Sequence, residues 1–425
     1  MHVLIIGSGG REHALSWAIS DSPLVEALFI TPGSPGTDRL AEAVALDIAN
    51  HQQIISFCTE QQIDLVVIGP EAPLVDGLVD SLDAANIASF GPSAAAAQLE
   101  GSKEFARDFN QRHNIPQPRW QSFDQAEDAI EFARTLGGAS VIKADGLAAG
   151  KGVIVCDTLE QAETAIRSLL GGRFAEASAR IVVEERIYGP EMSAFALMDG
   201  DTAIWLASAQ DHKRAFDNDE GENTGGMGAI SPSPLETDEL QSVIMKQIIA
   251  PVCAGMKAEN MPYRGVLYVG LMLTDDGPKV IEYNCRFGDP EAQVIIPRMM
   301  TDLVSAIMTL NEGGLGHFNL RLSAKTAITV VMATQGYPGT YEKGSVITEI
   351  DAAEQGGCLV FHAGTAINSS GQLIASGGRV LAVTAIDDDP VRARALAYQG
   401  VKTICWDQGF YRSDIASKAL GLSVE

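Results

Sequence analysis

Two oxygen-bearing side chains, Glu282 and Asn284, lie two positions apart in the segment 279–284, Lys-Val-Ile-Glu-Tyr-Asn, which predicts a strand. Side chains on a strand alternate between its two faces, so Glu282 and Asn284 point to the same side. Carboxylate and amide oxygens suit Mg2+, which completes its coordination with water and substrate phosphates. The pair therefore predicts a metal site on the floor of an ATP site, with an edge strand and a charged turn as the alternative.

The loop after this segment carries three further charged side chains, Arg286, Asp289 and Glu291, among Gly and Pro residues. Binding and catalytic residues are frequently held on loops by a rigid scaffold. We therefore expect the loop to aim these side chains at a substrate.

The first glycine-rich segment, Gly7-Ser-Gly-Gly10, follows a predicted strand. Glu12 stands where the dinucleotide motif G-x-G-x-x-G requires its third glycine, which disfavours NAD binding. Backbone amides at the start of the next helix, with Arg11 beside them, still favour a phosphate. A purely structural turn is the alternative.

The second glycine-rich segment, residues 146–152, lies between two predicted strands. It is one residue shorter than a P-loop and ends in Gly152 rather than Ser or Thr, which excludes a Walker A motif. A glycine loop between strands can still fold over a triphosphate, with Lys151 and backbone amides at its oxygens. A plain hairpin is the alternative.

Charged residues at other predicted strands also fit a nucleoside triphosphate as the ligand. Lys143 lies inside an apolar strand, where an ammonium group is costly unless an anion accompanies it, and a phosphate is the expected anion. Glu184, Glu185 and Glu191 follow the strand at 180–183 and could contact an adenine or a ribose. Solvated charge at a strand end is an equal alternative for these three acids.

A later loop, Asp211-His-Lys-Arg214, combines one acid with two cations, and Asn223-Thr-Gly-Gly-Met-Gly228 follows it. Its glycines allow a ligand to approach the backbone closely. His212 is interpreted as structural rather than as a base. The seven histidines form no zinc-binding motif, and no G-x-S-x-G nucleophile motif is present.

The elements that must position these residues predict several units. Short apolar runs alternate with helical segments over residues 2–100, which predicts a parallel α/β domain with ligand-binding loops at the carboxyl ends of its strands. Residues 124–187 predict a small α/β insert, and residues 188–325 carry further strands. From residue 326 onward the pattern predicts a mixed terminal domain.

Composition limits the class of protein. A chain of 425 residues exceeds one hydrophobic core, so two to four domains are expected. Its net charge of -25 argues against a nucleic-acid or anionic-membrane surface. Six widely spaced cysteines favour reduced thiols in a cytoplasmic protein, and no apolar run is long enough to cross a membrane.

Seven motifs, in order along nearly the whole chain, resemble the phosphoribosylamine-glycine ligases, also called glycinamide ribonucleotide synthetases, of the ATP-grasp superfamily. They are Gly7-Ser-Gly-Gly-Arg-Glu-His-Ala-Leu15, Gly69-Pro-Glu-Ala-Pro-Leu74, Leu99-Glu-Gly-Ser-Lys103, Lys143-Ala-Asp-Gly-Leu-Ala-Ala-Gly-Lys-Gly152, Asp211-His-Lys-Arg214, Asn223-Thr-Gly-Gly-Met-Gly228 and Glu282-Tyr-Asn-Cys-Arg-Phe-Gly-Asp-Pro-Glu291.

The resemblance implies a multidomain fold of the α/β and α+β classes. A parallel pre-ATP-grasp domain would span residues 1–102, a two-lobed ATP-grasp unit 103–325 with its small lobe at about 124–187, and a C-terminal domain 326–425. It also implies the second step of de novo purine synthesis, in which ATP, glycine and 5-phosphoribosylamine give glycinamide ribonucleotide, ADP and phosphate through a glycyl phosphate. No enzyme nucleophile is required.

Carried over position by position, the resemblance also implies roles for individual residues. ATP would be bound by Lys103, Lys143, Gly150, Lys151, Gly152, Glu184, Glu185 and Glu191. Mg2+ or Mn2+ would be bound by Glu282 and Asn284, and the catalytic residues would be Asp211, Arg286 and Asp289. The phosphoribosyl group would contact Gly9, Gly10, Arg11, Lys213 and Arg214.

Some questions stay open at this stage. Glu222 replaces the proline that the family usually has before Asn223, and the strand at 266–273 has no carboxylate, so the number of metal ions is undecided. The chain could be a monomer or a homodimer. Another ATP-grasp ligase or carboxylase of purine synthesis, a non-catalytic nucleotide sensor and an NAD oxidoreductase are the competing functions.

Overall fold

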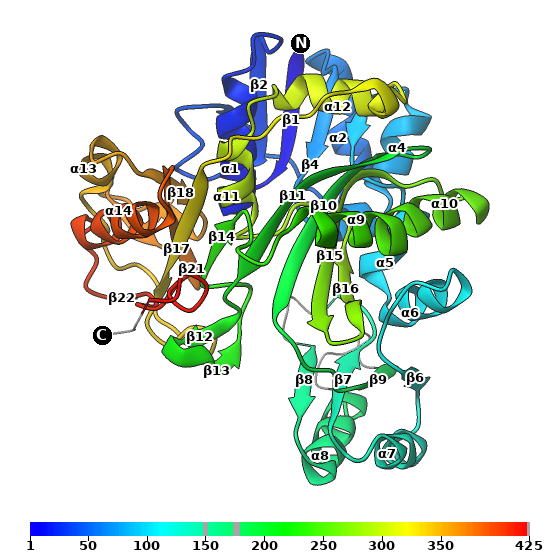
Figure 1. The fold of residues 1–425 in the computed structure, drawn as a ribbon. Coiled ribbons are helices and arrows are strands. Elements are labelled where there is room, and N and C mark those ends of the chain that lie inside the picture. Colours follow the sequence, from blue (N-terminus) through cyan, green and yellow to red (C-terminus); the bar gives the residue numbers. More distant parts are fainter. Residues whose placement is uncertain (148–151, 173–178, 423–425) are drawn as a thin grey trace.

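The chain is described by a computed structural model that covers residues 1–147, 152–172 and 179–422. Within these ranges the strands form an N-terminal parallel sheet, a small antiparallel sheet, a large antiparallel sheet and two short hairpins. The small sheet and its helices stand apart from the rest of the molecule, at the bottom of Figure 1. The predicted multidomain α/β architecture is confirmed.

The N-terminal unit is a five-stranded parallel sheet in the order β3-β2-β1-β4-β5. Its central strands consist of buried aliphatic residues, as expected for parallel strands covered on both faces. The strands are β1 (His2–Gly7), β2 (Ala27–Pro32), β3 (Glu42–Ala43), β4 (Leu65–Ile68) and β5 (Ser89–Phe90). The helices are α1 (Gly10–Ser20), α2 (His51–Glu60), α3 (Glu71–Val75), α4 (Leu78–Ala84) and α5 (Ala94–Gly101).

The small lobe follows helix α6 (Lys103–Arg112) and has a hydrophobic core of its own, which includes Ile142, Ile166 and Val183. Its antiparallel sheet has the order β6-β9-β7-β8. The strands are β6 (Trp120–Phe123), β7 (Ser140–Ala144), β8 (Val153–Cys156) and β9 (Ile181–Glu185), and the helices are α7 (Ala126–Thr135) and α8 (Leu159–Leu170). A separate core lets this lobe pack as a unit.

The large sheet runs in the order β16-β15-β10-β11-β14-β17-β21-β18, with β22 also paired to β17. β14 pairs with β17, so the strands after residue 325 extend the same sheet rather than starting a new one. The strands are β10 (Glu191–Asp199), β11 (Ala203–Asp211), β14 (Gly228–Ser231), β15 (Arg264–Thr274), β16 (Gly277–Asn284), β17 (Thr326–Thr334), β18 (Leu359–His362), β21 (Arg379–Asp387) and β22 (Gly409–Phe410).

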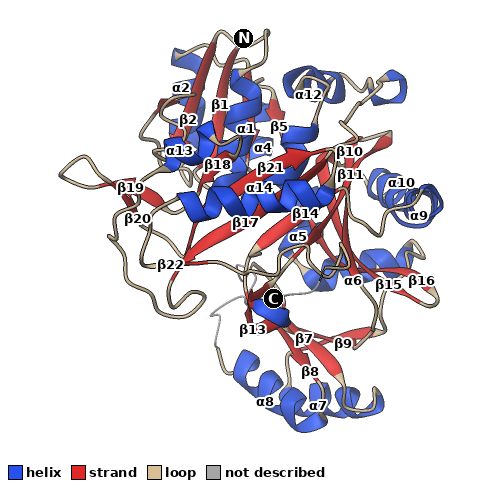
Figure 2. Cartoon of the chain, turned by 60° about the vertical axis from the view of Figure 1, so that its left-hand side comes forward, coloured by secondary structure: helices blue, strands red, loops and turns tan. Residues whose placement is uncertain are grey.

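Helices cover this sheet, and α14 lies across β17 and β21 (Figure 2). The hairpin β12 (Arg214–Phe216) with β13 (Glu220–Asn223) projects beside the small lobe. The remaining elements are α9 (Asp238–Ile244), α10 (Ala250–Ala258), α11 (Ala292–Ile295), α12 (Leu303–Asn311), α13 (Ile350–Gln355), α14 (Pro390–Thr403), β19 (Thr365–Ile367) and β20 (Leu373–Ala375).

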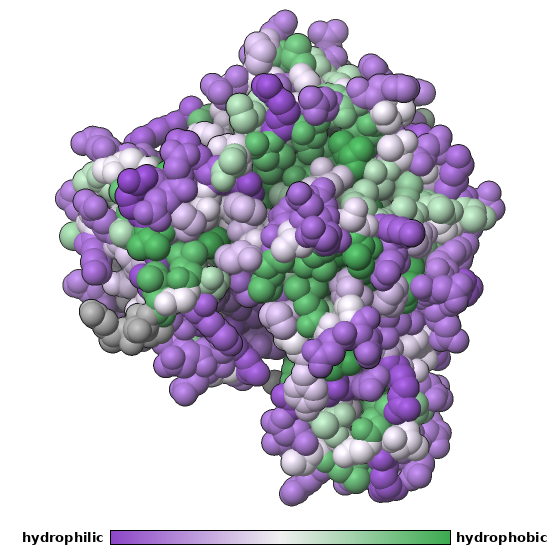
Figure 3. All heavy atoms as spheres, viewed as in Figure 1, coloured by the Kyte–Doolittle hydropathy of each residue, from purple (hydrophilic) through white to green (hydrophobic). Residues whose placement is uncertain are grey.

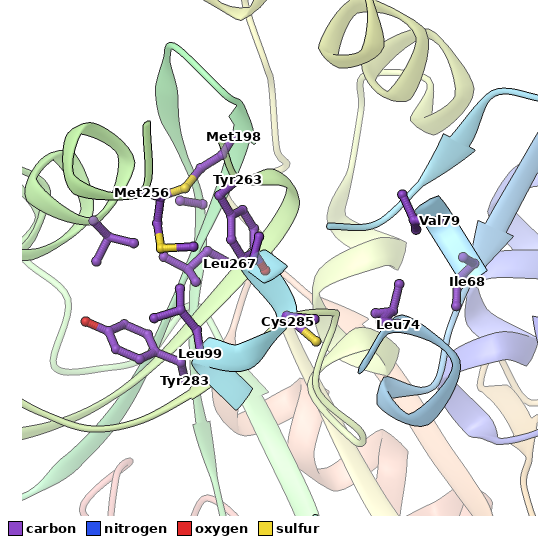
Figure 4. Close-up of a cluster of buried hydrophobic side chains, with 14 of the residues drawn as sticks. Ile68, Leu74, Val79, Leu99, Met198, Met256, Tyr263, Leu267, Tyr283 and Cys285 are labelled. Carbon is purple, nitrogen blue, oxygen red and sulfur yellow. The ribbon is translucent and has the colours of Figure 1, made fainter. Parts of the chain in front are cut away.

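One hydrophobic cluster joins the N-terminal unit to the large sheet (Figure 4). Leu74 and Leu99 from helices α3 and α5 belong to the same cluster as Leu267 of β15 and Tyr283 of β16. Tyr283 and Cys285 are almost fully buried, which leaves the alternate positions of β16 to face away from this core. Packing of Tyr283 and Cys285 into this core therefore leaves the side of β16 with Glu282 and Asn284 available to bind a ligand.

Candidate active site

A cleft of about 1380 Å3 lies where the N-terminal unit, the small lobe and the large sheet meet. The notch between the small lobe and the body of the molecule is visible in Figure 3. The cleft brings together predicted site residues from across the chain. They are Arg11, Lys103, Lys143, Gly152, Glu184, Glu185, Glu191, Asp211, Lys213, Arg214, Glu282, Asn284, Arg286 and Asp289.

The floor of the cleft carries the predicted metal pair. Glu282 and Asn284 both line it, as the alternation along β16 predicted. The side chain of Glu282 is 34% exposed and accepts a hydrogen bond of 2.8 Å from Lys213 Nζ. The Lys213 ammonium lowers the pKa of Glu282 to about 2, so this carboxylate is ionised at neutral pH.

A β-bulge at Ile281 shapes the strand next to this pair. Glu282 is opposite Gly270 and Val280 is opposite Leu271, so Ile281 has no partner in the ladder. Its carbonyl accepts hydrogen bonds of 2.7 Å from both Arg107 Nη2 and Lys143 Nζ. The bulge thus connects β16 to the small lobe through Lys143 and to helix α6 through Arg107.

On the small-lobe side of the cleft, Lys143 Nζ lies 2.9 Å from a carboxylate oxygen of Glu184. The sequence predicted that a phosphate would accompany this buried ammonium. In the structure its anionic partner is instead the carboxylate of Glu184. Burial lowers the pKa of Lys143 to about 8, because it destabilises the charged form. Glu184 also accepts two hydrogen bonds of 2.8 Å from Arg107, a residue that the sequence did not single out.

The remaining predicted nucleotide ligands differ in how they are held. Lys103 Nζ donates to the Gly146 carbonyl at 3.1 Å, which places it against the start of the glycine-rich segment. Glu185 and Glu191 are partly exposed, and Glu191 lies 3.7 Å from Lys213. Gly150 and Lys151 lie outside the described residues.

On the opposite side of the cleft, Arg286 contacts two acids of the N-terminal unit. Its Nε lies 3.3 Å from Glu71 and its Nη2 lies 2.8 Å from Glu100. Burial opposes the charge on Arg286, but these carboxylates outweigh it and the pKa of the guanidinium rises. Sequence reasoning missed Glu71 and Glu100, although both stand within motifs that carried the family resemblance.

Asp211 and Pro290, the residue after Asp289, both lie against the glycine loop of residues 223–228. A Cβ atom at Gly226 would lie 2.7 Å from Asp211 Oδ1 and 2.4 Å from Pro290 Cδ, so glycine alone leaves room for these two residues. Burial, and then the charge of Glu291, raise the pKa of Asp211 well above its usual range. Asp211, Asp289 and Arg286 all line the cleft.

Arg379, on β21, ties this region together. Its Nη1 donates to the carbonyls of Gly225 at 2.6 Å and Asp289 at 2.7 Å, and it lies 3.5 Å from Asp289 Oδ1. The sequence offered no signal for Arg379, because it stands alone in an apolar strand of the C-terminal part.

The start of helix α1 differs from the expectation of an open phosphate site. The Gly9 amide donates to Glu12 Oε2 at 2.6 Å, and Arg11 Nε donates to Glu12 Oε1 at 2.7 Å. A Cβ atom at Gly9 would lie 3.3 Å from Asp289 Oδ2, which places this second acid beside the same backbone. Carboxylates of the chain itself therefore occupy the positive end of the helix, and Gly9 and Gly10 are not among the described residues that line the cleft.

Glu12 also explains the glycines around it. A Cβ atom at Gly69 would lie 2.1 Å from Glu12 Oε1, and one at Gly7 would lie 2.4 Å from Glu12 Cγ. The Glu12 side chain fills the space between the ends of β1 and β4, where a dinucleotide-binding fold admits a pyrophosphate. This packing agrees with the argument from sequence against NAD.

Arg214 lies at the edge of the cleft on β12. Its Nη1 donates to the Gly221 carbonyl at 2.7 Å, and its own carbonyl accepts from Arg412 at 3.0 Å. Arg412 is buried between Asp219 and Asp414, and its position in the C-terminal segment was not anticipated.

A small lobe that carries the buried Lys143, together with an antiparallel sheet that carries an acid and an amide, defines the ATP-grasp class of enzymes, which use ATP. The biotin carboxylase domain of Hydrogenobacter thermophilus 2-oxoglutarate carboxylase, solved with MgADP and bicarbonate, shares this fold. Its TM-score is 0.71 at 16% identity, over 96% of this chain and 91% of that one.

Comparison with known protein families identifies the family within this class to which the chain belongs. Residues 1–100 match the phosphoribosylglycinamide synthetase N domain, residues 101–292 its ATP-grasp (A) domain and residues 327–418 its C domain. The chain therefore belongs to the phosphoribosylglycinamide synthetase family of ligases, and the predicted family is confirmed.

Individual relatives agree over nearly the whole chain. The phosphoribosylamine–glycine ligase of Mesorhizobium japonicum is 50% identical over 420 residues, which cover 99% of each chain. The crystal structure of the Thermotoga maritima phosphoribosylamine–glycine ligase has a TM-score of 0.86 at 33% identity, over 98% of this chain and 100% of that one. In the part of this chain that the structure describes, no helix is both long and apolar enough to span a membrane.

Proposed function

We propose that this chain joins glycine to 5-phosphoribosylamine at the expense of ATP, giving glycinamide ribonucleotide, ADP and phosphate. The observation that carries the proposal is one cleft in which Lys143, Glu282 and Arg286 face a common space, in a chain that its relatives match over 99% of its length. Similarity of this extent to ligases of this name favours this reaction over another ATP-grasp ligase or carboxylase.

The nucleotide lies on the small-lobe side of the cleft in this proposal. Lys103 and Lys143 bind its phosphates, together with Gly150, Lys151 and Gly152. Glu184, Glu185 and Glu191 line the side that receives the adenine and the ribose. Because Glu184 already binds Arg107 and Lys143, its carboxylate orients Lys143 rather than reaching a ribose hydroxyl.

The donor set on β16 fits Mg2+ or Mn2+. Among the described residues, no cluster of three His, Cys, Asp or Glu side chains forms a complete metal cage. Glu282 and Asn284 would therefore supply two oxygens and leave the other positions to phosphates and water, which is the usual arrangement for Mg2+. When bound, the metal supplies charge neutralisation at the phosphate groups. The ion pair between Glu282 and the Lys213 cation supports this assignment, because the carboxylate is ionised and already has a positive partner.

The reaction proceeds in two substitutions. A carboxylate oxygen of glycine attacks the γ-phosphorus, and the bond to the bridging oxygen of ADP breaks. The amine of phosphoribosylamine then attacks the glycyl carbonyl carbon, the C–O bond to phosphate breaks, and the nitrogen loses a proton. Arg286 balances the charge on the acyl phosphate, and Asp211 and Asp289 hold the glycine ammonium. These residues act by positioning and charge stabilisation rather than as nucleophiles.

The phosphoribosyl group is assigned to Gly9, Gly10, Arg11, Lys213 and Arg214. Arg11, Lys213 and Arg214 support this assignment because they line the cleft. Gly9 and Gly10 would act through the packing of α1 against Asp289, since Glu12 already accepts from the Gly9 amide. To bind the phosphate of the phosphoribosyl group, Lys213 would have to give up its ion pair with Glu282.

Isotope transfer tests the acyl phosphate route. Glycine labelled with 18O in its carboxylate should deliver one labelled oxygen to each inorganic phosphate, measured by 31P NMR or mass spectrometry. The control omits phosphoribosylamine. Unlabelled phosphate formed together with glycinamide ribonucleotide would contradict the proposed mechanism.

The cysteines support a reducing compartment. All six are free thiols, and five of them are buried. Burial raises the pKa of Cys58 and of Cys156 to about 11, which keeps these thiols protonated and unreactive. We therefore propose the cytoplasm as the site of the reaction.

A further inference from the structure

Glu100, at the end of helix α5, is a buried carboxylate that no step of the proposed mechanism uses. It is 8% exposed and belongs to the N-terminal unit. Its Oε1 accepts from Arg286 Nη2 at 2.8 Å, and its Oε2 accepts from the Cys285 amide at 2.7 Å and lies 3.1 Å from Cys285 Sγ. One side chain therefore binds consecutive residues at the end of β16.

The third partner is Asn284. One terminal atom of its amide lies 2.9 Å from Glu100 Oε1 and 3.2 Å from the Tyr283 carbonyl oxygen. Both neighbours are acceptors, so this atom is assigned as the donor Nδ2. An amide has a donor end and an acceptor end. Glu100 Oε1 already accepts from Arg286 Nη2, so it meets the donor end of the Asn284 amide. Glu100 thus leaves Oδ1 as the end of Asn284 that is free to meet a cation.

We propose that Glu100 is a positioning residue that selects the orientation of the Asn284 amide and holds Arg286 beside it. An asparagine serves as a metal ligand only through its oxygen, so a fixed orientation removes the half of its conformations that would present NH2 groups to the metal. Outer-shell partners of this kind commonly change metal affinity by about 10-fold to 100-fold. This inference rests on the proposed metal role of Asn284.

The test measures the Mn2+ affinity of the full chain with a non-hydrolysable ATP analogue, by EPR of free Mn2+. Glu100→Gln should weaken Mn2+ binding by about tenfold when Asn284 is retained, because glutamine accepts or donates and no longer selects one amide orientation. In the Asn284→Asp background the same substitution should leave Mn2+ affinity within about twofold, because both oxygens of a carboxylate can bind the metal and no amide orientation remains to be selected.

Glu71→Gln is the matched control. Glu71 also pairs with Arg286 and carries the same charge, but it contacts the guanidinium at Nε, whereas the Asn284 amide donates to Glu100. The control substitution should leave Mn2+ affinity within about twofold in both backgrounds. Thermal unfolding and circular dichroism show that each variant is folded. If Glu100→Gln does not fold, Glu100→Asp replaces it in both backgrounds, since its shorter side chain also loses the contact with the Asn284 amide.

A loss of Mn2+ affinity that occurs with Asn284 present and is absent in the Asn284→Asp background supports the inference. Equal shifts in both backgrounds, no shift, or an equal effect of Glu71→Gln would overturn it, because general charge or packing would then explain the result. Failure of the wild-type chain both to bind Mn2+ with nucleotide and to release ADP would instead overturn the proposed function.

Discussion

Lys143 shows how one side chain can be prepared for a phosphate by its surroundings. Its ammonium is buried in β7 and is stabilised by Glu184 and by the Ile281 carbonyl. Burial still dominates, so the pKa of the amine falls from about 10.5 to about 8. The lysine is charged at neutral pH, yet it lies close enough to its pKa for alkaline conditions to remove the charge.

We expect kcat/KM for ATP to fall as pH rises through about 8, because this parameter reports groups of the free enzyme and neutral Lys143 loses its attraction for phosphate. Lys143→Arg should move this decline upward by more than about one pH unit, since a guanidinium stays protonated. Initial rates at a series of pH values on both sides of this pKa measure the effect. An unchanged profile in Lys143→Arg would assign the titration to another group.

The loops that join the strands give the cleft its shape. Gly226, with φ of +113°, brings the loop of residues 223–228 against Asp211 and Pro290. Gly277, the first residue of β16, has nearly the same φ of +111°, but a Cβ atom there would have no neighbour within 4 Å. At both positions a residue other than glycine would have a strained backbone. The two positions differ in how closely neighbouring atoms pack against them.

Gly226→Ala should lower kcat by at least about tenfold and destabilise the fold by about 2–3 kcal/mol, because the methyl group displaces Asp211 or Pro290 in addition to the left-handed strain. Gly277→Ala should cost only about 1 kcal/mol and leave kcat unchanged. Steady-state kinetics and urea unfolding of both variants provide the measurement. Equal losses of activity would show that strain alone, and not the contact, matters.

Across the whole molecule, the cleft depends on contacts between units that are distant in the sequence. Lys143 joins the small lobe to β16, and Arg107 joins helix α6 to the same strand. Glu100 joins the N-terminal unit to Cys285, just after β16, and Arg379 joins the C-terminal part to the Asp289 loop. The continuous sheet through β14 and β17 gives Arg379 a fixed base. Each unit therefore contributes a residue that holds the site in place.

Arg379→Met should reduce stability by about 2 kcal/mol and raise KM for glycine, because two carbonyls and Asp289 lose a charged donor. Arg392→Met is the control in the same part of the chain, since Arg392 forms an exposed pair with Asp387 and should change stability by less than about 0.5 kcal/mol. Urea midpoints and glycine saturation curves measure both. A normal glycine KM in a destabilised Arg379→Met would confine its role to folding.

Several features of this protein can be read from local sequence. The alternation of β16 predicts that Glu282 and Asn284 share a face, and both line the cleft. Glycine-rich segments mark the loops, because few other residues allow such turns. The order of seven motifs indicates the family, which the domain matches confirm. These signals are local, since they depend on neighbours in the chain.

Long-range packing decides the rest. The anion beside Lys143 is Glu184, the acids at Arg286 are Glu71 and Glu100, and the start of α1 is covered by Glu12. A charged side chain binds whichever partner the fold brings within hydrogen-bonding distance, and residues 185 positions apart, such as Glu100 and Cys285, meet only after the units pack. Local patterns therefore predict where ligands are bound, whereas tertiary packing selects the partners that orient them.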